Sequence, residues 1–111
     1  MILALSPSPY FTADFDLQIA WYVERADERV ARRYAESVVH TLGRLCDNPG
    51  IGARCGFRHP MLSTLRFCPI ARPFQKHIIF YRYDDKNLFA ERVMHGSRDL
   101  PNRLLEPPGA D

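Results

Sequence analysis

The chain has 111 residues, of which 46% are hydrophobic, and a formal net charge of +2; together these predict one globular domain over residues 1–111 and exclude a disordered segment. The sequence pI near 8.6 is below the value above ~9 that marks a nucleic-acid binder by composition, so we expect no specific DNA binding by the chain alone. No apolar run approaches the ~20 residues of a membrane helix, and the first residues lack the charges of a signal peptide. We therefore expect a cytoplasmic protein with no membrane contact.

Two helices are predicted in the first half of the chain, after a short strand at residues 2–5. Ser8-Pro9 opens the first helix, because Ser is a favoured N-cap and Pro a favoured first helical residue. Asp27-Glu28 starts the second helix, and Asn48-Pro49-Gly50 ends it. Their short connection predicts an antiparallel helix hairpin. Both helices carry apolar residues at helical spacing: Phe11, Phe15, Ile19 and Tyr22 in the first, and Ala31, Tyr34, Ala35, Val38, Leu42 and Leu45 in the second.

Strands are predicted in the second half. Residues 49–60 contain three glycines and two prolines and are typical of a surface loop. Residues 64–68 can form a strand. Residues 77–83 and 88–95 are predicted to be the arms of a β-hairpin, because they are rich in β-branched and aromatic residues and flank a turn of Asp, Lys and Asn. A short helix is expected at residues 100–105.

The resulting order, β-α-α-β-β-β with a short C-terminal helix, predicts an α+β fold in which a helix hairpin packs on a small antiparallel-rich sheet. Residues 78–81 are apolar on both faces of the strand, as in an inner strand that is covered on each side by the protein itself or by a partner. The residues that we expect in the core lie on the apolar sides of the second helix and of this strand: Tyr34, Val38, Leu42, Ile79 and Tyr81.

The sequence gives no support for a metal or a cofactor. The cysteines are widely spaced, and with His40 and His59 they lack the paired short spacing of a zinc site. No glycine-rich nucleotide-binding motif is present. The segment from His95 to Asp99 contains the residue types of a nucleophilic triad, but five consecutive residues after a strand are poorly placed to align as one. A turn at Gly96 and a helix cap at Ser97 or Asp99 is the simpler interpretation.

The ordered set of motifs resembles the RelE/ParE superfamily of bacterial toxins from type II toxin–antitoxin modules, and its ParE, or plasmid-stabilisation, branch in particular. The resemblance covers nearly the whole chain and is carried by Ser8-Pro9, Asp16-Leu17, Tyr22, the run Asn48 to Gly52, the strand His77 to Arg82 and the segment Arg92 to Asp99. It implies a compact fold of the kind predicted above. It also implies a cognate antitoxin, expected to be of ribbon-helix-helix type, that holds the toxin inactive.

The resemblance implies two activities. ParE-like toxins poison DNA gyrase, whereas RelE-like toxins cut mRNA in the ribosomal A site. Active RelE-like toxins carry an arginine early in the hairpin strand, a second arginine after the glycine that follows the last strand, and a tyrosine in the tail. The corresponding residues here are Ile78, Arg98 and Leu104 or a neighbour. Two of the three groups are missing, which favours the ParE branch and a toxin that is not an enzyme.

Three functional hypotheses follow. In the first, the chain inhibits gyrase by protein–protein contact through Arg98, Asp99 and Arg103. In the second, it is a ribosome-dependent endoribonuclease with His77, His95 and Arg98 as catalytic groups. In the third, it is a decayed toxin that acts only as an antitoxin-bound corepressor. For the antitoxin we expect an exposed apolar strip between the helix hairpin and the sheet, with Phe11, Phe15 and Arg82 as contact residues.

Overall fold

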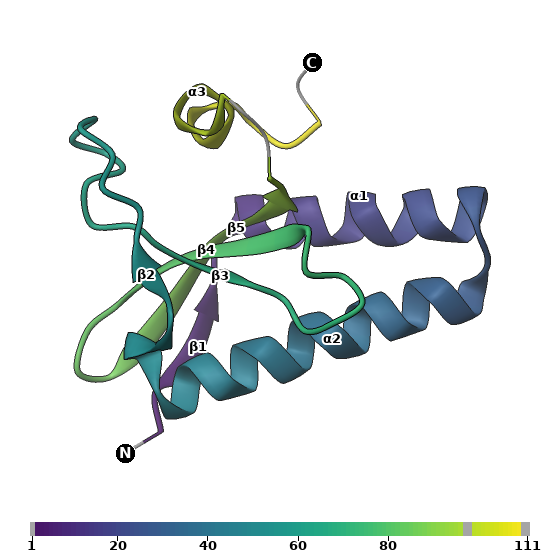
Figure 1. The fold of residues 1–111 in the computed structure, drawn as a ribbon, viewed down its shortest axis with the longest axis horizontal. Helices are drawn as coiled ribbons and strands as arrows, with labels where there is room; N and C mark the ends of the chain where they lie inside the picture. Colours follow the sequence, from purple (N-terminus) through teal and green to yellow (C-terminus); the bar gives the residue numbers. More distant parts are fainter. Residues whose placement is uncertain (1, 97–98, 110–111) are drawn as a thin grey trace.

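Two helices pack against one face of a five-stranded sheet in the computed structural model, which describes residues 2–96 and 99–109 (Figure 1). The elements in chain order are β1 (Ala4–Pro7), α1 (Pro9–Arg25), α2 (Glu28–Asp47), the 3-10 helix η1 (Pro49–Ile51), β2 (Ala53–Arg54), β3 (Arg66–Pro69), β4 (His77–Tyr83), β5 (Asn87–His95) and α3 (Leu100–Leu105). The predicted α+β class, the helix hairpin, the β-hairpin and the short last helix are confirmed.

The sheet has the strand order β1-β5-β4-β3-β2. Its first strand pairs in parallel with its last, from Ala4 opposite Asn87 to Pro7 opposite Ala90, and the other pairings are antiparallel. The ladder between β4 and β5 shifts register, since Phe80 is opposite Arg92 while Tyr81 is opposite Ala90. This β-bulge changes the alternation of the strand, and Ala90 and Val93, three residues apart, both lie in the same core cluster.

Both helix starts follow the sequence prediction. The Ser8 side chain accepts a hydrogen bond from the Phe11 backbone N–H at 3.0 Å, and its own hydroxyl donates to the Glu91 carbonyl of β5 at 2.8 Å. Asp27 accepts a bond from the Val30 N–H at 3.0 Å. Each cap satisfies a backbone donor that the first helical turn leaves free. The Ser8 bond also fixes the start of α1 against the last strand.

Apolar residues pack on both faces of the sheet, so the inner strand is covered by the protein itself. The larger cluster lies under the helices and includes Tyr34, Val38, Leu42, Ile79 and Tyr81, whose burial confirms the predicted core. A smaller cluster lies on the other face, where β4 contacts α3 and the segment before β3; its buried members are Leu62, Leu65, Phe80 and Leu104.

Residues 49–60 differ from the predicted loop, because they contain η1 and the two-residue strand β2. The strand exists through pairing with β3, in which Ala53 lies opposite Phe67 and Arg54 opposite Arg66. Gly52 permits the approach that starts it: a Cβ there would lie 2.3 Å from the Tyr81 hydroxyl oxygen, which instead accepts the Gly52 N–H at 3.0 Å. Two strand boundaries also move, since β1 and β3 begin two residues later than predicted, where partners on β5 and β4 become available.

Replacing Leu42 by Ala should lower the free energy of unfolding by about 2–5 kcal/mol, because the side chain is 6% exposed and its loss leaves a cavity in the core. Val39, on the same helix and 65% exposed, provides the matched control, and Val39→Ala should change stability by no more than about 0.5 kcal/mol. Urea titration of both variants measures the difference. Equal effects would show that the buried side of α2 is assigned wrongly.

Candidate functional site

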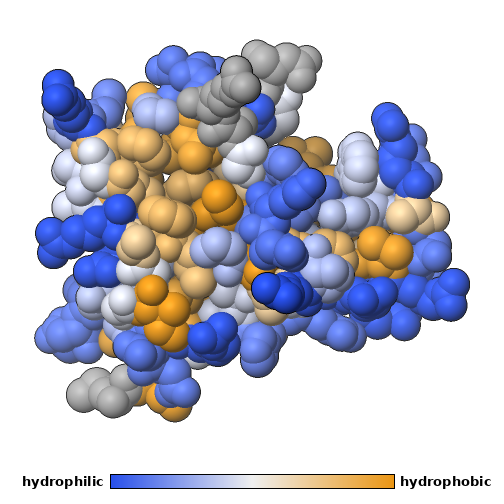
Figure 2. Space-filling model, viewed as in Figure 1, coloured by the Kyte–Doolittle hydropathy of each residue, from blue (hydrophilic) through white to orange (hydrophobic). Residues whose placement is uncertain are grey.

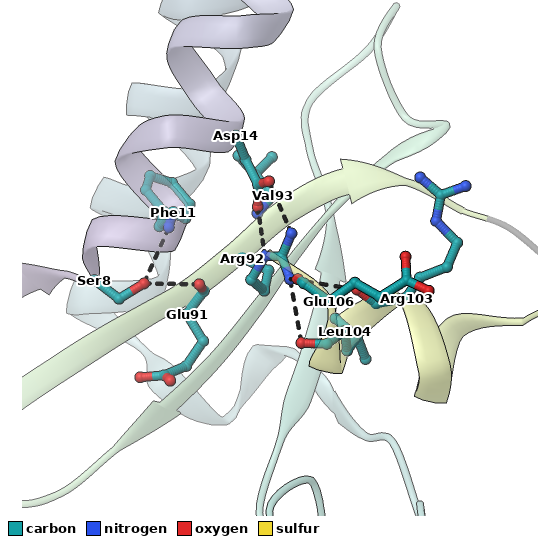
Figure 3. A network of polar contacts seen from close by, with 9 residues as sticks. All are labelled: Ser8, Phe11, Asp14, Glu91, Arg92, Val93, Arg103, Leu104 and Glu106. Atoms are coloured by element: carbon teal, nitrogen blue, oxygen red, sulfur yellow. Dashed lines mark hydrogen bonds and ion pairs between the residues drawn. The ribbon is translucent and has the colours of Figure 1, made fainter. Parts of the chain in front are cut away.

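The side chain of Arg92 connects three elements at one end of the molecule (Figure 3). Its Nε donates to Oδ2 of Asp14 on α1 at 2.7 Å and its Nη2 to Oδ1 at 3.0 Å, which makes the pair bidentate. The Arg92 and Asp14 side chains are only 6% and 8% exposed. The Val93 N–H also donates to Asp14, at 3.2 Å. Two charges that are removed from water in this way are stable only when geometry and hydrogen bonding are good, as they are here.

The remaining nitrogen of Arg92 holds α3. Its Nη1 donates to the carbonyl oxygens of Leu104 at 3.1 Å, Glu106 at 2.6 Å and Arg103 at 3.3 Å (Figure 3). These carbonyls belong to the carboxyl end of the helix, where carbonyl oxygens lack the full set of intrahelical donors and favour a positive charge; the Arg103 carbonyl also accepts the Glu106 N–H at 3.2 Å. Leu104 is buried beneath them. One guanidinium therefore fixes the position of α3 relative to α1 and β5.

The surface of α3 carries two of the three residues predicted to contact the target. Asp99 and Arg103 are exposed, and the Arg103 N–H donates to the Asp99 carbonyl at 3.0 Å, so both belong to the first turn of the helix. Asn102 donates to the Asp99 carboxylate at 3.1 Å. Arg98, the third of these residues and also the proposed catalytic arginine, lies outside the described residues.

The two histidines of the ribonuclease hypothesis lie opposite each other on β4 and β5, with ring centroids 5.4 Å apart. His77 is 6% exposed and its Nε2 lies 3.0 Å from the Tyr22 hydroxyl, while its buried Nδ1 has no hydrogen-bond partner among the described residues. Burial, assisted by the charge of His95, lowers the pKa of His77 to about 4. The ring is therefore neutral at pH 7 and has no proton to give as a general acid. His95 is exposed, with Nδ1 3.1 Å from the Gly96 carbonyl.

Ile78 and Leu104, the residues expected at the RelE-like strand arginine and at or near the tail tyrosine, are packing residues. Ile78 is half-buried and lies against the smaller apolar cluster, and Leu104 is a buried member of that cluster. Both side chains contribute to the attachment of α3 and of residues 57–65 to the sheet.

Within the part of the chain that the structure describes, no three His, Cys, Asp or Glu side chains are grouped to hold a metal ion. Of the described helices, none has the length and apolar character needed to span a bilayer.

The expected apolar strip for the antitoxin is placed differently by the structure. Phe11 is buried in the core, so the expectation that it is exposed is wrong: its side of α1 packs with the core cluster on the sheet, while Tyr10 next to it is exposed. Phe15 is half-buried and stacks on Tyr34, with ring centroids 6.0 Å apart. Arg82 lies on the opposite face, where it donates to Thr64 Oγ1 at 2.6 Å and to the Met61 carbonyl.

An apolar groove that the sequence did not reveal lies beside Arg82. It has a volume of about 350 Å³ and runs between the start of α1, residues 61–65 and α3. Its exposed apolar residues are Tyr10, Met61 and Leu105. Hydrophobic surface also gathers over the strands between residues 53–65 and α3, whereas the surface over much of the helix hairpin is hydrophilic (Figure 2). The sequence lacked a signal for this groove because its residues come from five separate segments.

Comparisons with known proteins agree with this architecture. Residues 5–100 match the family model described as the ParE toxin of the type II toxin–antitoxin system parDE. Among solved structures, the chain is similar to one described as a chromosomal ParDE toxin–antitoxin system from P. aeruginosa, with a TM-score of 0.69 and 18% sequence identity over 86% of this chain and 98% of that one. At this identity the structural match shows a shared fold. A search of curated proteins gave no match.

Replacing Arg92 by Met should destabilise the protein by about 3–5 kcal/mol, because it leaves the Asp14 carboxylate buried and unpaired. The exposed pair of Arg29 and Asp27, 3.7 Å apart, supplies the control; Arg29→Met should cost less than about 1 kcal/mol. The double variant Asp14→Leu with Arg92→Met should recover much of the loss, since it removes both charges. Urea titration checks all three, and a loss of under 1 kcal/mol for Arg92→Met would contradict the assigned role.

Stability should fall as the pH is lowered from about 6.5 to about 4, with His77 contributing up to about 3 kcal/mol. The sign follows from its lowered pKa: in this window the unfolded chain takes up a proton that the buried ring does not. The contribution is complete above the unfolded pKa and is lost as the pH falls. His77→Gln should flatten the dependence in urea titrations between pH 7 and pH 4.5. An unchanged slope in that variant would assign the acid sensitivity to other groups.

Proposed function

The chain belongs to the ParE toxin family of type II toxin–antitoxin systems, and from this premise we propose that it inhibits DNA gyrase by protein–protein contact in the cytoplasm. The contact surface is the exposed first turn of α3, with Asp99 and Arg103 as the residues that face the target. We include Arg98 in this surface because it directly precedes Asp99 in the sequence. The observation that carries the proposal is the attachment of α3 by Arg92, which holds an exposed, charged turn in one position.

The chemistry of the described residues supports a binding function over RNA cleavage. A metal-free ribonuclease needs groups that accept and donate protons and that stabilise charge on the phosphate. His77 is buried and neutral at pH 7 and is hydrogen-bonded to Tyr22. Ile78 and Leu104 are apolar packing residues where RelE-like toxins carry an arginine and a tyrosine. Pre-ordering of α3 favours tight binding instead, because less conformational freedom is lost when the target is bound.

A cognate antitoxin is the second partner that we propose, of the ribbon-helix-helix type. The apolar groove between α1, residues 61–65 and α3 has the features of its docking site. Met61 is 64% exposed there, and Arg82 lies at the same groove. An antitoxin segment with apolar and acidic side chains would cover Met61 and Tyr10 and pair with Arg82. Phe15 is half-buried at the helix hairpin and lies on the other face of the sheet. An antitoxin segment that also contacts Phe15 would have to pass around the edge of the sheet.

Purified chain should inhibit the supercoiling of relaxed plasmid by gyrase, and Arg103→Glu should raise the concentration needed by about tenfold or more, as expected for the reversal of an interface arginine. Arg32→Glu is the matched control, because it makes the same charge change at an exposed position near the start of α2. It should leave inhibition unchanged.

Primer extension on mRNA from induced cells tests the competing activity. Intact transcripts together with blocked replication are expected. Cuts phased with codons within minutes of induction, abolished by Arg98→Ala, would replace the gyrase proposal with the ribonuclease one. Absence of both effects would favour the decayed toxin that serves only as an antitoxin-bound corepressor.

A further inference from the structure

Arginines from three strands line one depression at the end of the sheet beside the tip of the β-hairpin. Arg54 on β2, Arg66 on β3 and Arg82 on β4 line a surface depression of about 600 Å³ together with Ser63, Thr64, Tyr83 and Phe89. Arg54 and Arg66 are direct cross-strand partners. Like charges in that position destabilise a sheet. A like-charged cross-strand pair that costs stability, in a depression that a third arginine also lines, points to a ligand that neutralises the charge.

Within residues 2–96 and 99–109, the three arginines have no acidic ion-pair partner. Over the described residues, the ion pairs join Arg29 to Asp27 and Arg92 to Asp14. Asp84 follows Tyr83 directly, but its carboxylate accepts the backbone N–H groups of Lys86 at 2.8 Å and Asn87 at 2.7 Å and is used in the hairpin turn. The positive charge of the cluster is therefore not compensated from within.

Two of the guanidinium groups donate hydrogen bonds to neutral acceptors. These bonds orient the groups but do not neutralise their positive charge. Arg66 donates to the Gly52 carbonyl at 2.6 Å, and Gly52 is itself fixed by the Tyr81 hydroxyl. The Arg66 guanidinium lies over the Tyr83 ring, 5.5 Å from its centroid. Arg82 donates to Thr64 Oγ1 at 2.6 Å and to the Met61 carbonyl. Planar donors that are ordered before binding suit bidentate contacts to phosphate.

We propose that this arginine cluster binds the phosphate backbone of single-stranded nucleic acid, with Tyr83 as a stacking surface for a base. The Thr64 hydroxyl, whose oxygen accepts from Arg82, supplies a further phosphate donor, and the partly exposed Tyr83 lines the same depression beside Arg66, as in sites that combine a basic groove with an aromatic platform. The contact is independent of base sequence. The proposal goes beyond gyrase inhibition and concerns a different surface from the target-facing turn on α3. It shares Arg82 with the proposed antitoxin groove, whereas Arg54 and Arg66 belong to the arginine cluster alone.

Fluorescence anisotropy of the full chain with a labelled 20-nucleotide oligo(dT) at 50–200 mM NaCl tests the proposal. Binding should weaken with salt with a log–log slope of about −2, as expected for three phosphate contacts on a single strand. Arg54→Glu should weaken binding by about tenfold or more, and Tyr83→Ala by about tenfold through the loss of stacking. Arg32→Glu, with the same change in net charge on α2, should change binding by less than about twofold.

A stability measurement separates loss of the site from misfolding. Arg54→Glu places opposite charges across β2 and β3, so its urea midpoint should equal or exceed that of the parent chain while binding falls. Absence of binding at 50 mM NaCl, or equal losses for Arg54→Glu and Arg32→Glu, would overturn the proposal. Displacement of the oligonucleotide by an equally charged poly-glutamate peptide at the same concentration would also overturn it and would assign the cluster to an acidic protein segment. Gyrase inhibition by the same variants reports on the other surface separately.

Discussion

The buried ion pair between Arg92 and Asp14 is the interaction on which the arrangement of this molecule depends. Its two charges would be costly inside the protein if either stood alone, and each is saturated by the other and by backbone groups. The arginine is adjacent to the β-bulge of β5, opposite Phe80, at the point where the alternation of the strand changes. From there it reaches α1 on one side and the carboxyl end of α3 on the other. A methionine or leucine could fill the same space, but could not satisfy three carbonyl oxygens at the end of a short helix.

This arrangement gives the two faces of the sheet different roles. The face under α1 and α2 is a core of aromatic and aliphatic side chains, and His77 is buried at its border in the neutral form. The other face carries a smaller apolar cluster, α3 and the segment before β3, and the apolar groove and the arginine cluster lie along this segment. Surfaces suited to partners therefore occur where the chain is held to the sheet by a few specific bonds, such as those of Arg82 and Arg92, rather than by the main core.

The parts of the fold that could be predicted from sequence are those specified by local chemistry. Ser8 caps the first helix as expected and the second helix starts at the predicted Asp27-Glu28, because helix starts depend on residues about three positions apart. The β-hairpin follows from its β-branched and aromatic composition and its turn residues, and the buried side of α2 follows from helical periodicity. By contrast, Asp14 and Arg92 are 78 residues apart, and no pattern in the sequence joins them. Strand β2 has two residues and exists only through its partner, and the groove and the arginine cluster each combine separate segments. Phe11 was expected at the surface because the residue spacing identified the apolar stripe of the first helix but not whether this stripe faces the core or the solvent.

The central claim is that Arg92 holds α3 in the position that its exposed turn needs. Amide hydrogen exchange tests this most directly in the double variant Asp14→Leu with Arg92→Met, which removes the connection without leaving a buried charge. The account predicts that the amides of α3, such as those of Arg103 and Glu106, lose protection by about tenfold or more, while the central amides of α2 keep theirs. Equal protection of α3 in the parent and the variant would contradict the account, because packing of Leu104 alone would then be sufficient to hold the helix.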